Sequence, residues 1–142
     1  MKYLLDTNVI SELVAPRPNP TVLKWIDGLD PEGVYLSVIA VGEIRKGIEK
    51  LPDSPRRKEL LSWLQDELLL RFGGRILVFD LEVMMTWGIL VGRLERSGRP
   101  IPALDSLIAA LALHHGLALA TRNEADFEGT GIQVVNPWQA GG

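Results

Sequence analysis

Short apolar runs alternate with amphipathic stretches along the whole chain of 142 residues, and this alternation limits the folds that the chain can adopt. The apolar runs are predicted to be strands over residues 3–5, 34–36, 76–79, 117–120 and 132–135. Strands separated by helices require right-handed crossovers and a mainly parallel sheet. We therefore expect an α/β fold of three layers, with helices on both faces of a central five-stranded sheet. The length is that of a single domain, residues 1–142.

Capping residues and helix-ending residues mark the expected helices. Three prolines at positions 16, 18 and 20 force a loop, after which Thr21 is predicted to cap a short helix. Further caps are predicted at Ser37, at Asp53 or Ser54, and at Asp80, for helices over residues 38–51, 53–72 and 80–98. The segment ALDSLIAALALHH is expected to form a helix that ends at Gly116. Because this segment is apolar on nearly every side, it is predicted to be buried.

Composition excludes several classes of function. The chain has no cysteine, which excludes disulfides, thiolate metal sites and cysteine nucleophiles. No apolar run approaches the ~20 residues of a membrane span, and the N-terminus lacks the pattern of a signal peptide, so we expect a cytoplasmic protein that binds no membrane. The net charge of −3 gives no general attraction for nucleic acid, and any such binding depends on a local patch.

Carboxylates fall at positions that the topology is expected to bring together. Asp6 ends the first strand, Asp105 begins the apolar helix, and Asp126 lies just past the fourth strand, near Asn123. Strand ends and the helix starts that follow them lie on one edge of a parallel sheet, which is where ligands bind in such folds. Glu43, at the border of the apolar face of its helix, is expected to reach the same place.

Carboxylates crowded in this way repel one another, and a divalent cation removes that penalty. An oxygen-only donor set suits Mg²⁺, whereas the absence of cysteine and of a spaced histidine pair disfavours zinc. Taken singly, each acid also has a structural explanation: Asp6 as a turn residue, Glu43 as a solvated helix residue, Asp105 as a cap, and Asp126 as a turn or cap residue. The metal-site hypothesis therefore depends on their joint placement.

Several blocks of sequence resemble those of a known family. They are LLDTNVISEL, VGEIRKGIEKL, PALDSLIAALALHHGLALATRNEADF and NPW. In this order they are similar to PIN-domain proteins, above all to the VapC and FitB group, the toxins of bacterial type II toxin–antitoxin pairs. The likeness runs from Met1 to about Trp138. It implies a PIN-like fold and a ribonuclease that depends on Mg²⁺ or Mn²⁺.

The resemblance also implies site residues. The family's acids fall on Asp6, Glu43 and Asp105, as metal ligands that help activate water for hydrolysis of an RNA phosphodiester. Many relatives carry aspartate where this chain has Asn123, so the fourth contact comes from Asp126, from the Asn123 amide through water, or from both. The family's D-T-N block places Thr7 and Asn8 as supporting residues.

The family resemblance further implies partners. These are an RNA substrate, a cognate VapB-like antitoxin, a second copy of the chain in a homodimer, and DNA only indirectly, through the antitoxin. Local positive charge is the feature that could contact RNA, and Arg45, Arg99 and Arg122 are the candidates for binding substrate phosphate.

Two other functions stay open from the residues alone. The chain could serve as a PIN-fold binding module, weakly active or inactive, that acts as co-repressor with a DNA-binding antitoxin, and Asn123 leaves room for this. An aspartate-based phosphatase is a third hypothesis, because Asp6 follows a strand. It is disfavoured because Asn8 occupies the position of the second acid in a D-x-D motif.

Overall fold

A five-stranded parallel sheet forms the centre of the protein, in a computed structural model that describes residues 1–139. The strand order is β3-β2-β1-β4-β5, and every neighbouring pair is parallel. The strands are β1 (Tyr3–Leu5), β2 (Val34–Ser37), β3 (Ile76–Leu77), β4 (Ala118–Ala120) and β5 (Val134–Val135). The predicted α/β class and five-stranded parallel sheet are confirmed, although β3 and β5 are shorter than expected.

Helices connect the strands and cover both faces of the sheet. They are α1 (Thr7–Glu12), α2 (Pro20–Asp27), α3 (Val38–Glu49), α4 (Pro55–Trp63), α5 (Leu69–Arg71), α6 (Leu81–Arg96) and α7 (Ala103–His115). Two short 3₁₀ helices, η1 (Pro31–Gly33) and η3 (Glu124–Phe127), and one π-helical turn, η2 (Leu64–Leu68), complete the set in the described part of the chain. None of the helices in residues 1–139 has the length and apolar character that crossing a bilayer requires.

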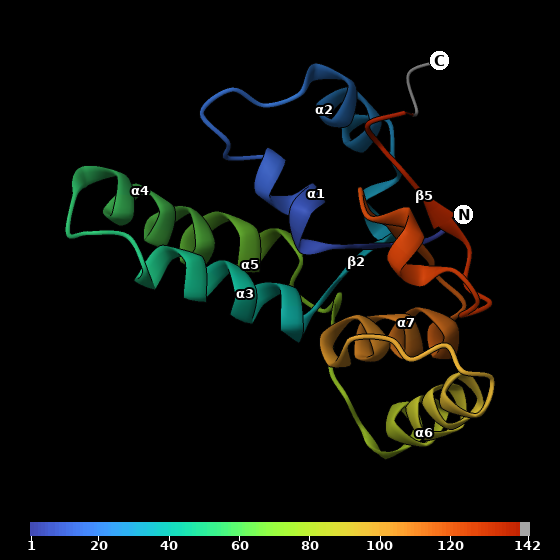
Figure 1. The fold of residues 1–142 in the computed structure, drawn as a ribbon. Coiled ribbons are helices and arrows are strands. Elements are labelled where there is room, and N and C mark those ends of the chain that lie inside the picture. The colour runs from blue at the N-terminus through green and yellow to red at the C-terminus, as the bar shows by residue number, and fades with distance from the viewer. Residues whose placement is uncertain (140–142) are drawn as a thin grey trace.

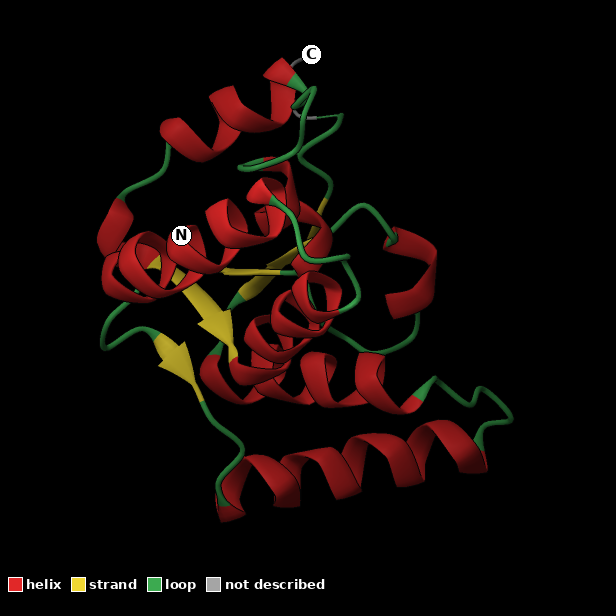
Figure 2. Cartoon of the chain, turned by 90° about the vertical axis from the view of Figure 1, so that its left-hand side faces the viewer, coloured by secondary structure: helices red, strands yellow, loops and turns green. Residues whose placement is uncertain are grey.

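The sheet separates two hydrophobic cores. Figures 1 and 2 show α6 and α7 packed together on one face, with α1 to α5 on the other. Successive side chains of a strand point to opposite faces, so Leu5 packs in the core beneath α1 to α5 while Leu4 packs against α6 and α7. Both faces of the central strand are thus covered, which explains why its residues form an uninterrupted apolar run.

The apolar helix α7 lies between the sheet and α6. Its residues from Ile108 to Ala112 are buried, as its composition predicted. The indole Nε1 of Trp87 on α6 donates a hydrogen bond of 2.8 Å to Ser106 Oγ on α7. This contact fixes the start of α7, where Asp105 lies.

Helices α4 and α5 form one continuous rod through the π-helical turn η2. Its apolar residues Leu60, Leu64, Leu68 and Phe72 recur every four positions. In an α-helix of about 3.6 residues per turn, such spacing drifts around the axis. The wider turn at Leu64–Leu68 corrects the drift, and Leu64, Leu68 and Phe72 are all buried in one core.

The predicted helix caps are confirmed with one exception. Ser37, Ser54 and Asp80 accept hydrogen bonds from the backbone N–H groups of the first turns that follow them. The prediction of Thr21 as a cap is wrong: Asn19 caps α2 and accepts from the backbone N–H of Thr21 at 2.8 Å. Pro20 occupies the first helical position, where its missing N–H costs nothing, and this moves the start of the helix back.

Candidate functional site

The site lies at the carboxyl ends of β1 and β4. After β1 the chain adds β2 and β3 on one side of it, and then crosses to add β4 and β5 on the other side. The strand order therefore reverses between β1 and β4, and ligands bind at such a switch point in open α/β sheets. Leu5 is in register with Ala120, and the backbone N–H of Asp6 donates to the Ala120 carbonyl at 2.9 Å. The residues that follow the two strands, Asp6 and Thr121, are therefore held side by side.

Asp6 is a nearly buried carboxylate with a fixed orientation. It is 9% exposed, its Oδ1 accepts from the Thr7 backbone N–H at 2.9 Å, and its Oδ2 accepts from the Thr121 hydroxyl at 2.8 Å. Burial raises the pKa of Asp6, and the charges of Glu43 and Asp126 add to that rise, while the two hydrogen bonds oppose it. Both oxygens are thus held in place, in a setting that favours added positive charge.

Glu43 reaches the site from α3, a helix that begins at the end of β2. The Thr7 hydroxyl donates a hydrogen bond of 2.6 Å to Glu43 Oε1. Thr7 therefore contacts two of the predicted acids, Asp6 through its backbone N–H and Glu43 through its hydroxyl. The side chain of Glu43 is half-buried, which agrees with its predicted place at the border of the apolar face of α3.

Asp105 lies in the first turn of α7 and is half-buried. Within residues 1–139 its carboxylate accepts no hydrogen bond, and α7 has no side-chain cap, so the structure gives no support to a capping role. Burial raises the pKa of Asp105, and the charges of Asp126, Asp6 and Glu43 each raise it further. The charges of three acids from separate elements, Asp6, Glu43 and Asp126, therefore all reach Asp105.

Two residues after β4, Asn123 and Asp126, are the candidates for the fourth position. The Asn123 backbone N–H donates to the Thr121 hydroxyl at 3.1 Å, whereas its side-chain amide has no partner among the described residues. Asp126, on η3, is exposed, and its charge acts on both Asp6 and Asp105. Only Asp126 contributes negative charge, so it extends the acidic cluster and Asn123 does not.

The donor set fits a hard divalent cation bound largely through water. It consists of carboxylate oxygens, and within residues 1–139 no three histidine or acidic side chains lie close enough to hold a metal ion directly. Mg²⁺ is typically bound by one or two carboxylates and keeps several of its waters, so it does not need such a cluster. The predicted Mg²⁺ or Mn²⁺ site thus matches the chemistry of the acids and stays a prediction.

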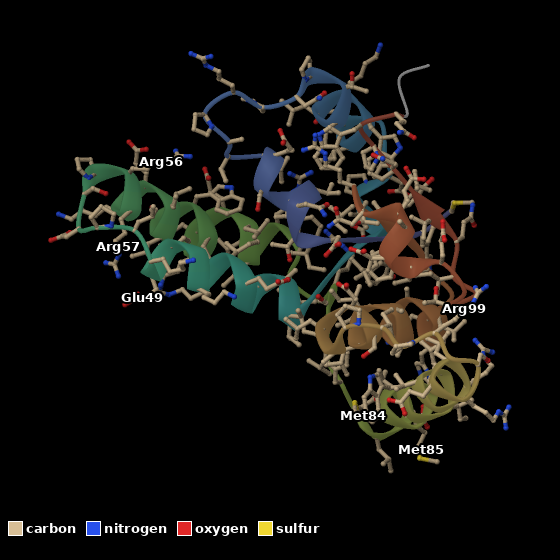
Figure 3. All side chains as sticks on the ribbon, viewed as in Figure 1. Glu49, Arg56, Arg57, Met84, Met85 and Arg99 are labelled. Carbon is tan, nitrogen blue, oxygen red and sulfur yellow. The ribbon has the colours of Figure 1, made fainter. Side chains whose placement is uncertain are left out.

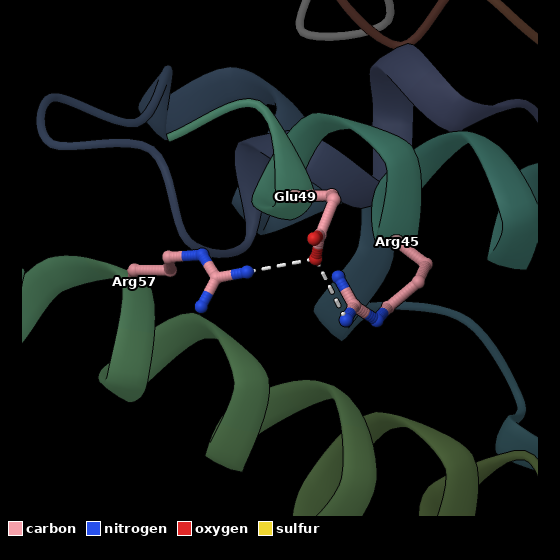
Figure 4. A network of polar contacts seen from close by, with 3 residues as sticks. All are labelled: Arg45, Glu49 and Arg57. Carbon is pink, nitrogen blue, oxygen red and sulfur yellow. Dashed lines mark hydrogen bonds and ion pairs between the residues drawn. The ribbon is translucent and has the colours of Figure 1, made fainter. Parts of the chain in front are cut away.

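The three candidate arginines have different surroundings. Arg45 pairs with Glu49 at 2.9 Å, and Arg57 of α4 pairs with the same carboxylate at 2.7 Å (Figure 4). Arg99 lies between α6 and α7, at the opposite end of the molecule from Arg57 (Figure 3), and its side chain packs against Gly129.

Arg122 is the candidate that follows the site directly in the chain. Its guanidinium carbon lies 5.0 Å from the centre of the Trp138 ring, and its backbone N–H donates to Asn8 Oδ1 at 3.3 Å. The backbone of Arg122 is therefore held at the site and its guanidinium lies over Trp138, whereas the guanidinium of Arg45 is engaged by Glu49.

Thr121 is the site residue that the sequence did not reveal. It is fully buried, and its hydroxyl accepts from Asn8 Nδ2 at 3.2 Å as well as donating to Asp6. A threonine that ends a strand is ordinary in a turn, so its type carries no signal. The usable signal was its position, because the first residue after β4 must lie beside the first residue after β1 in a parallel pair.

An apolar groove of about 360 Å³ begins at the site and runs between α1, α3 and α4. Thr7 and Glu43 line the end next to the acids, and Arg56, Leu60 and Trp63 line the other end. Figure 3 shows Arg56 at the far end of α4. Arg56 also donates a hydrogen bond to the Val14 carbonyl, which joins the two walls of the groove.

Comparison with known proteins places this geometry in a family. A family model described as PIN domain matches residues 3–132. The chain is 41% identical to VapC ribonuclease Y4jK of Sinorhizobium fredii, over 96% of this chain and 97% of that protein. It is 42% identical to toxin FitB of Neisseria gonorrhoeae, over 95% and 97%. The crystal structure of FitAcB from Neisseria gonorrhoeae superposes with a TM-score of 0.92 at 41% identity, over 96% and 99%. The chain therefore belongs to the PIN-domain family, and its likeness is to the VapC and FitB toxins.

Proposed function

We propose that this protein is the toxin of a type II toxin–antitoxin pair and hydrolyses RNA phosphodiester bonds with Mg²⁺ or Mn²⁺. The observation that carries the proposal is the geometry at the end of β1, where Thr7 joins Asp6 to Glu43 and Thr121 orients Asp6. The charges of Asp126, Asp6 and Glu43 also raise the pKa of Asp105. The names of the relatives support the reaction, because one is a VapC ribonuclease and another a FitB toxin.

The residues take distinct roles in this proposal. Asp6 and Asp105 are the groups that would hold the cation, because both lie in surroundings where negative charge is unfavourable. A bound cation would lower the pKa of a water molecule and stabilise the charge that develops on phosphate. Glu43 and Asp126 are the groups that would orient such a water and take up its proton, and Thr7 and Thr121 keep Glu43 and Asp6 in place.

The geometry argues against a covalent aspartyl intermediate. Both oxygens of Asp6 already accept hydrogen bonds, which lowers their nucleophilicity. Asn8, at the second position of a D-x-D motif, donates to Thr121 and accepts from the Arg122 backbone, so it supplies no acid. The phosphatase hypothesis therefore has no structural support.

The central test is cleavage of total RNA by the purified protein. We expect fragments with Mg²⁺ or Mn²⁺, none with EDTA, and a rate lowered about 100-fold or more by Asp6→Asn or by Asp105→Asn, because several kcal/mol of charge stabilisation is lost. The matched control is Asp53→Asn, an exposed aspartate before α4. Cleavage that persists in EDTA, or that both variants retain, would contradict the proposal. Intact RNA under every condition would favour the inactive co-repressor instead.

The groove supports the predicted antitoxin partner. Two solved relatives are FitAB bound to a DNA fragment, at 40% identity, and DNA-bound VapBC from Salmonella typhimurium, at 25%. In this chain the groove is apolar along α3 and α4 and ends at Glu43, so it suits an apolar segment that carries a basic side chain to the acids. DNA contact would then come through the antitoxin.

The predicted homodimer has a candidate surface on α6. Leu81, Met85 and Ile89 recur every four residues and are 77%, 63% and 70% exposed. Figure 3 shows Met85 on the outer side of α6, away from the sheet. Such a stripe is self-complementary, as a two-fold interface requires.

A further inference from the structure

Arg122 is an exposed cation beside an acidic site, and among residues 1–139 it pairs with no carboxylate. It follows Thr121 directly, and its backbone N–H is bound to Asn8, so its main chain is tied to the residues that hold Asp6. Its guanidinium instead lies over the ring of Trp138, with 5.0 Å between the guanidinium carbon and the ring centre.

Trp138 is itself held in place by the hydrophobic core and by a hydrogen bond of its backbone. Its ring is half-buried and packs against the core beneath α1 to α5. Its backbone N–H donates to Asn136 Oδ1 at 3.0 Å, and Asn136 Nδ2 donates to Glu124 Oε1 at 2.7 Å. The segment after β5 is thereby joined to the segment after β4. The ring is a fixed support, so Arg122 loses its side-chain freedom on folding and not on binding a ligand.

No residue in 1–139 accepts a hydrogen bond from the Arg122 guanidinium, and its contact with the aromatic ring needs none of its N–H groups. The N–H donors of arginine lie in the plane of the group, where they match two oxygens of a phosphate. A carboxylate partner would have used those donors, as Glu49 does with Arg45. The Trp138 ring fixes the position of the charge without occupying the donors.

A polyanion is repelled by four neighbouring acids, so RNA needs a cation near them. We propose that Arg122, held by Trp138, binds a backbone phosphate of the RNA strand next to the phosphate that is cleaved. This rests on the proposed function for the choice of RNA as ligand. In this arrangement Arg122 contacts substrate, and Trp138 is a positioning residue that acts through Arg122.

The experiment measures binding instead of cleavage. A fluorescein-labelled single-stranded RNA oligonucleotide is titrated with the Asp6→Asn protein in Mg²⁺ buffer, and anisotropy is followed at several salt concentrations. Adding Arg122→Gln is expected to weaken binding about tenfold, the loss that one charge-assisted hydrogen bond supports. It is also expected to lower the slope of log Kd against log salt by about 0.7, which corresponds to one phosphate contact on a single strand.

A matched control removes a similar arginine elsewhere. The guanidinium of Arg71 lies 5.4 Å from the Phe72 ring, close to Val34 at the amino end of β2, the sheet edge opposite the acids. Arg71→Gln removes the same charge from a stacked arginine and is expected to leave both the affinity and the salt slope unchanged. An equal loss from Arg71→Gln and Arg122→Gln would show a general charge effect and overturn the assignment.

A double-mutant cycle tests the positioning role of Trp138. Trp138→Leu is expected to weaken binding about threefold, and Trp138→Phe, which keeps an aromatic face, less. In the Arg122→Gln background, Trp138→Leu should not weaken RNA binding any further, because Trp138 acts through Arg122. A full additional loss would mean that the ring contacts RNA directly, and this overturns the positioning role.

The outcomes separate this inference from the proposed function. Wild-type protein that fails to cleave RNA, together with an Arg122-dependent salt slope, would reject the hydrolysis and retain the phosphate site. If the wild-type protein cleaves RNA while Arg122→Gln leaves the affinity and the salt slope unchanged, the hydrolysis is retained and the phosphate site is rejected. Circular dichroism of each variant confirms that the comparison is made between folded proteins.

Discussion

The hydroxyl of Thr121 donates a 2.8 Å hydrogen bond to Oδ2 of Asp6, across 115 positions of sequence. Thr121→Val keeps the shape of this fully buried side chain but removes the hydroxyl. Asp6, Asn8 and the backbone of Asn123 then each lose a partner. We expect the free energy of unfolding to fall by about 1–3 kcal/mol in urea titrations, and RNA cleavage to fall as Asp6 loses its orientation.

Two variants serve as controls for this prediction. Thr121→Ser retains the hydroxyl and should retain most of the activity. Thr130→Val removes another fully buried hydroxyl, one bound to the Phe127 carbonyl, and should lower stability alone. Unchanged cleavage in Thr121→Val would show that the hydrogen bond does not position Asp6.

Neutralising Asp105 should stabilise the metal-free protein. A carboxyl group whose folded pKa is raised holds extra protons in the folded state, so stability falls as the pH rises from the unfolded to the folded pKa and stays lower above it. Asp105→Asn has no carboxyl group to ionise at this position, so it does not lose this stability as the pH rises. At neutral pH in EDTA we expect its Tm to exceed that of the wild type by no more than about 4 °C, because solvent screens part of the repulsion.

The advantage of Asp105→Asn should disappear below the unfolded pKa of aspartate, about pH 3.9, and Mg²⁺ should raise the Tm of the wild type more than that of the variant. Thermal scans over a range of pH check both points. A Tm lower than wild type at neutral pH in EDTA would contradict the mutual repulsion of the acids.

The cap of α3 supports the helix that carries Glu43. The Ser37 hydroxyl accepts from the Ala40 backbone N–H at 3.0 Å in a buried setting. Ser37→Ala should lower the free energy of unfolding by about 1 kcal/mol, the usual loss at such a cap. Ser62→Ala, on the exposed face of α4, should change it by less than about 0.5 kcal/mol. Equal effects of the two variants in urea titrations would argue against the cap.

Filling the groove should separate antitoxin binding from catalysis. Gly47 lines the groove, and open space surrounds the position of an added Cβ, so Gly47→Leu introduces bulk without strain. We expect calorimetry to show at least about a tenfold loss of affinity for the cognate antitoxin, with RNA cleavage by the free toxin retained. Lys46→Leu puts the same side chain on the exposed face of α3 and should bind normally. Normal binding by Gly47→Leu would place the antitoxin elsewhere.

A charge on α6 should break the homodimer. Met85→Glu places a carboxylate in the middle of the exposed apolar stripe, where a two-fold contact would bury it against its own copy. We expect sedimentation equilibrium to give a dimer for the wild type and a monomer for Met85→Glu. Leu70→Glu, at an equally exposed leucine of α5, should remain dimeric. A dimeric Met85→Glu would exclude this face.

Local patterns explain the parts of the fold that the sequence predicted. A long apolar segment and a terminal glycine marked α7 at the residues where it is found, Ala103–His115, and the polar ends of the strands marked the sheet edge that carries Asp6. These signals lie within a few residues of the features they define. The family blocks then connected Asp6, Glu43 and Asp105, which the structure couples electrostatically.

Features that depend on distant partners were not predictable in the same way. The cap of α2 is a different case, because it is local: Pro20 favours the first helical position, which assigns the cap to Asn19 and not to Thr21. The role of Thr121 depends on the register between β1 and β4, and the ion pair between Glu49 and Arg57 depends on how α3 meets α4. The spacing of four along α4 and α5 did contain the signal for the π-helical turn, because an α-helix cannot keep that spacing on one face.

The place of β1 between β2 and β4 has a consequence for how the protein is made. Of the two strands beside β1, β4 comes later in the chain and ends at Ala120. A nascent chain therefore lacks Thr121 and η3 until most of its length has left the ribosome. Until then Asp6 has neither its hydroxyl partner nor the acids of α7 and η3 beside it. A cell that synthesises this toxin therefore meets no assembled nuclease site during most of translation, and an antitoxin already present has that interval in which to be ready.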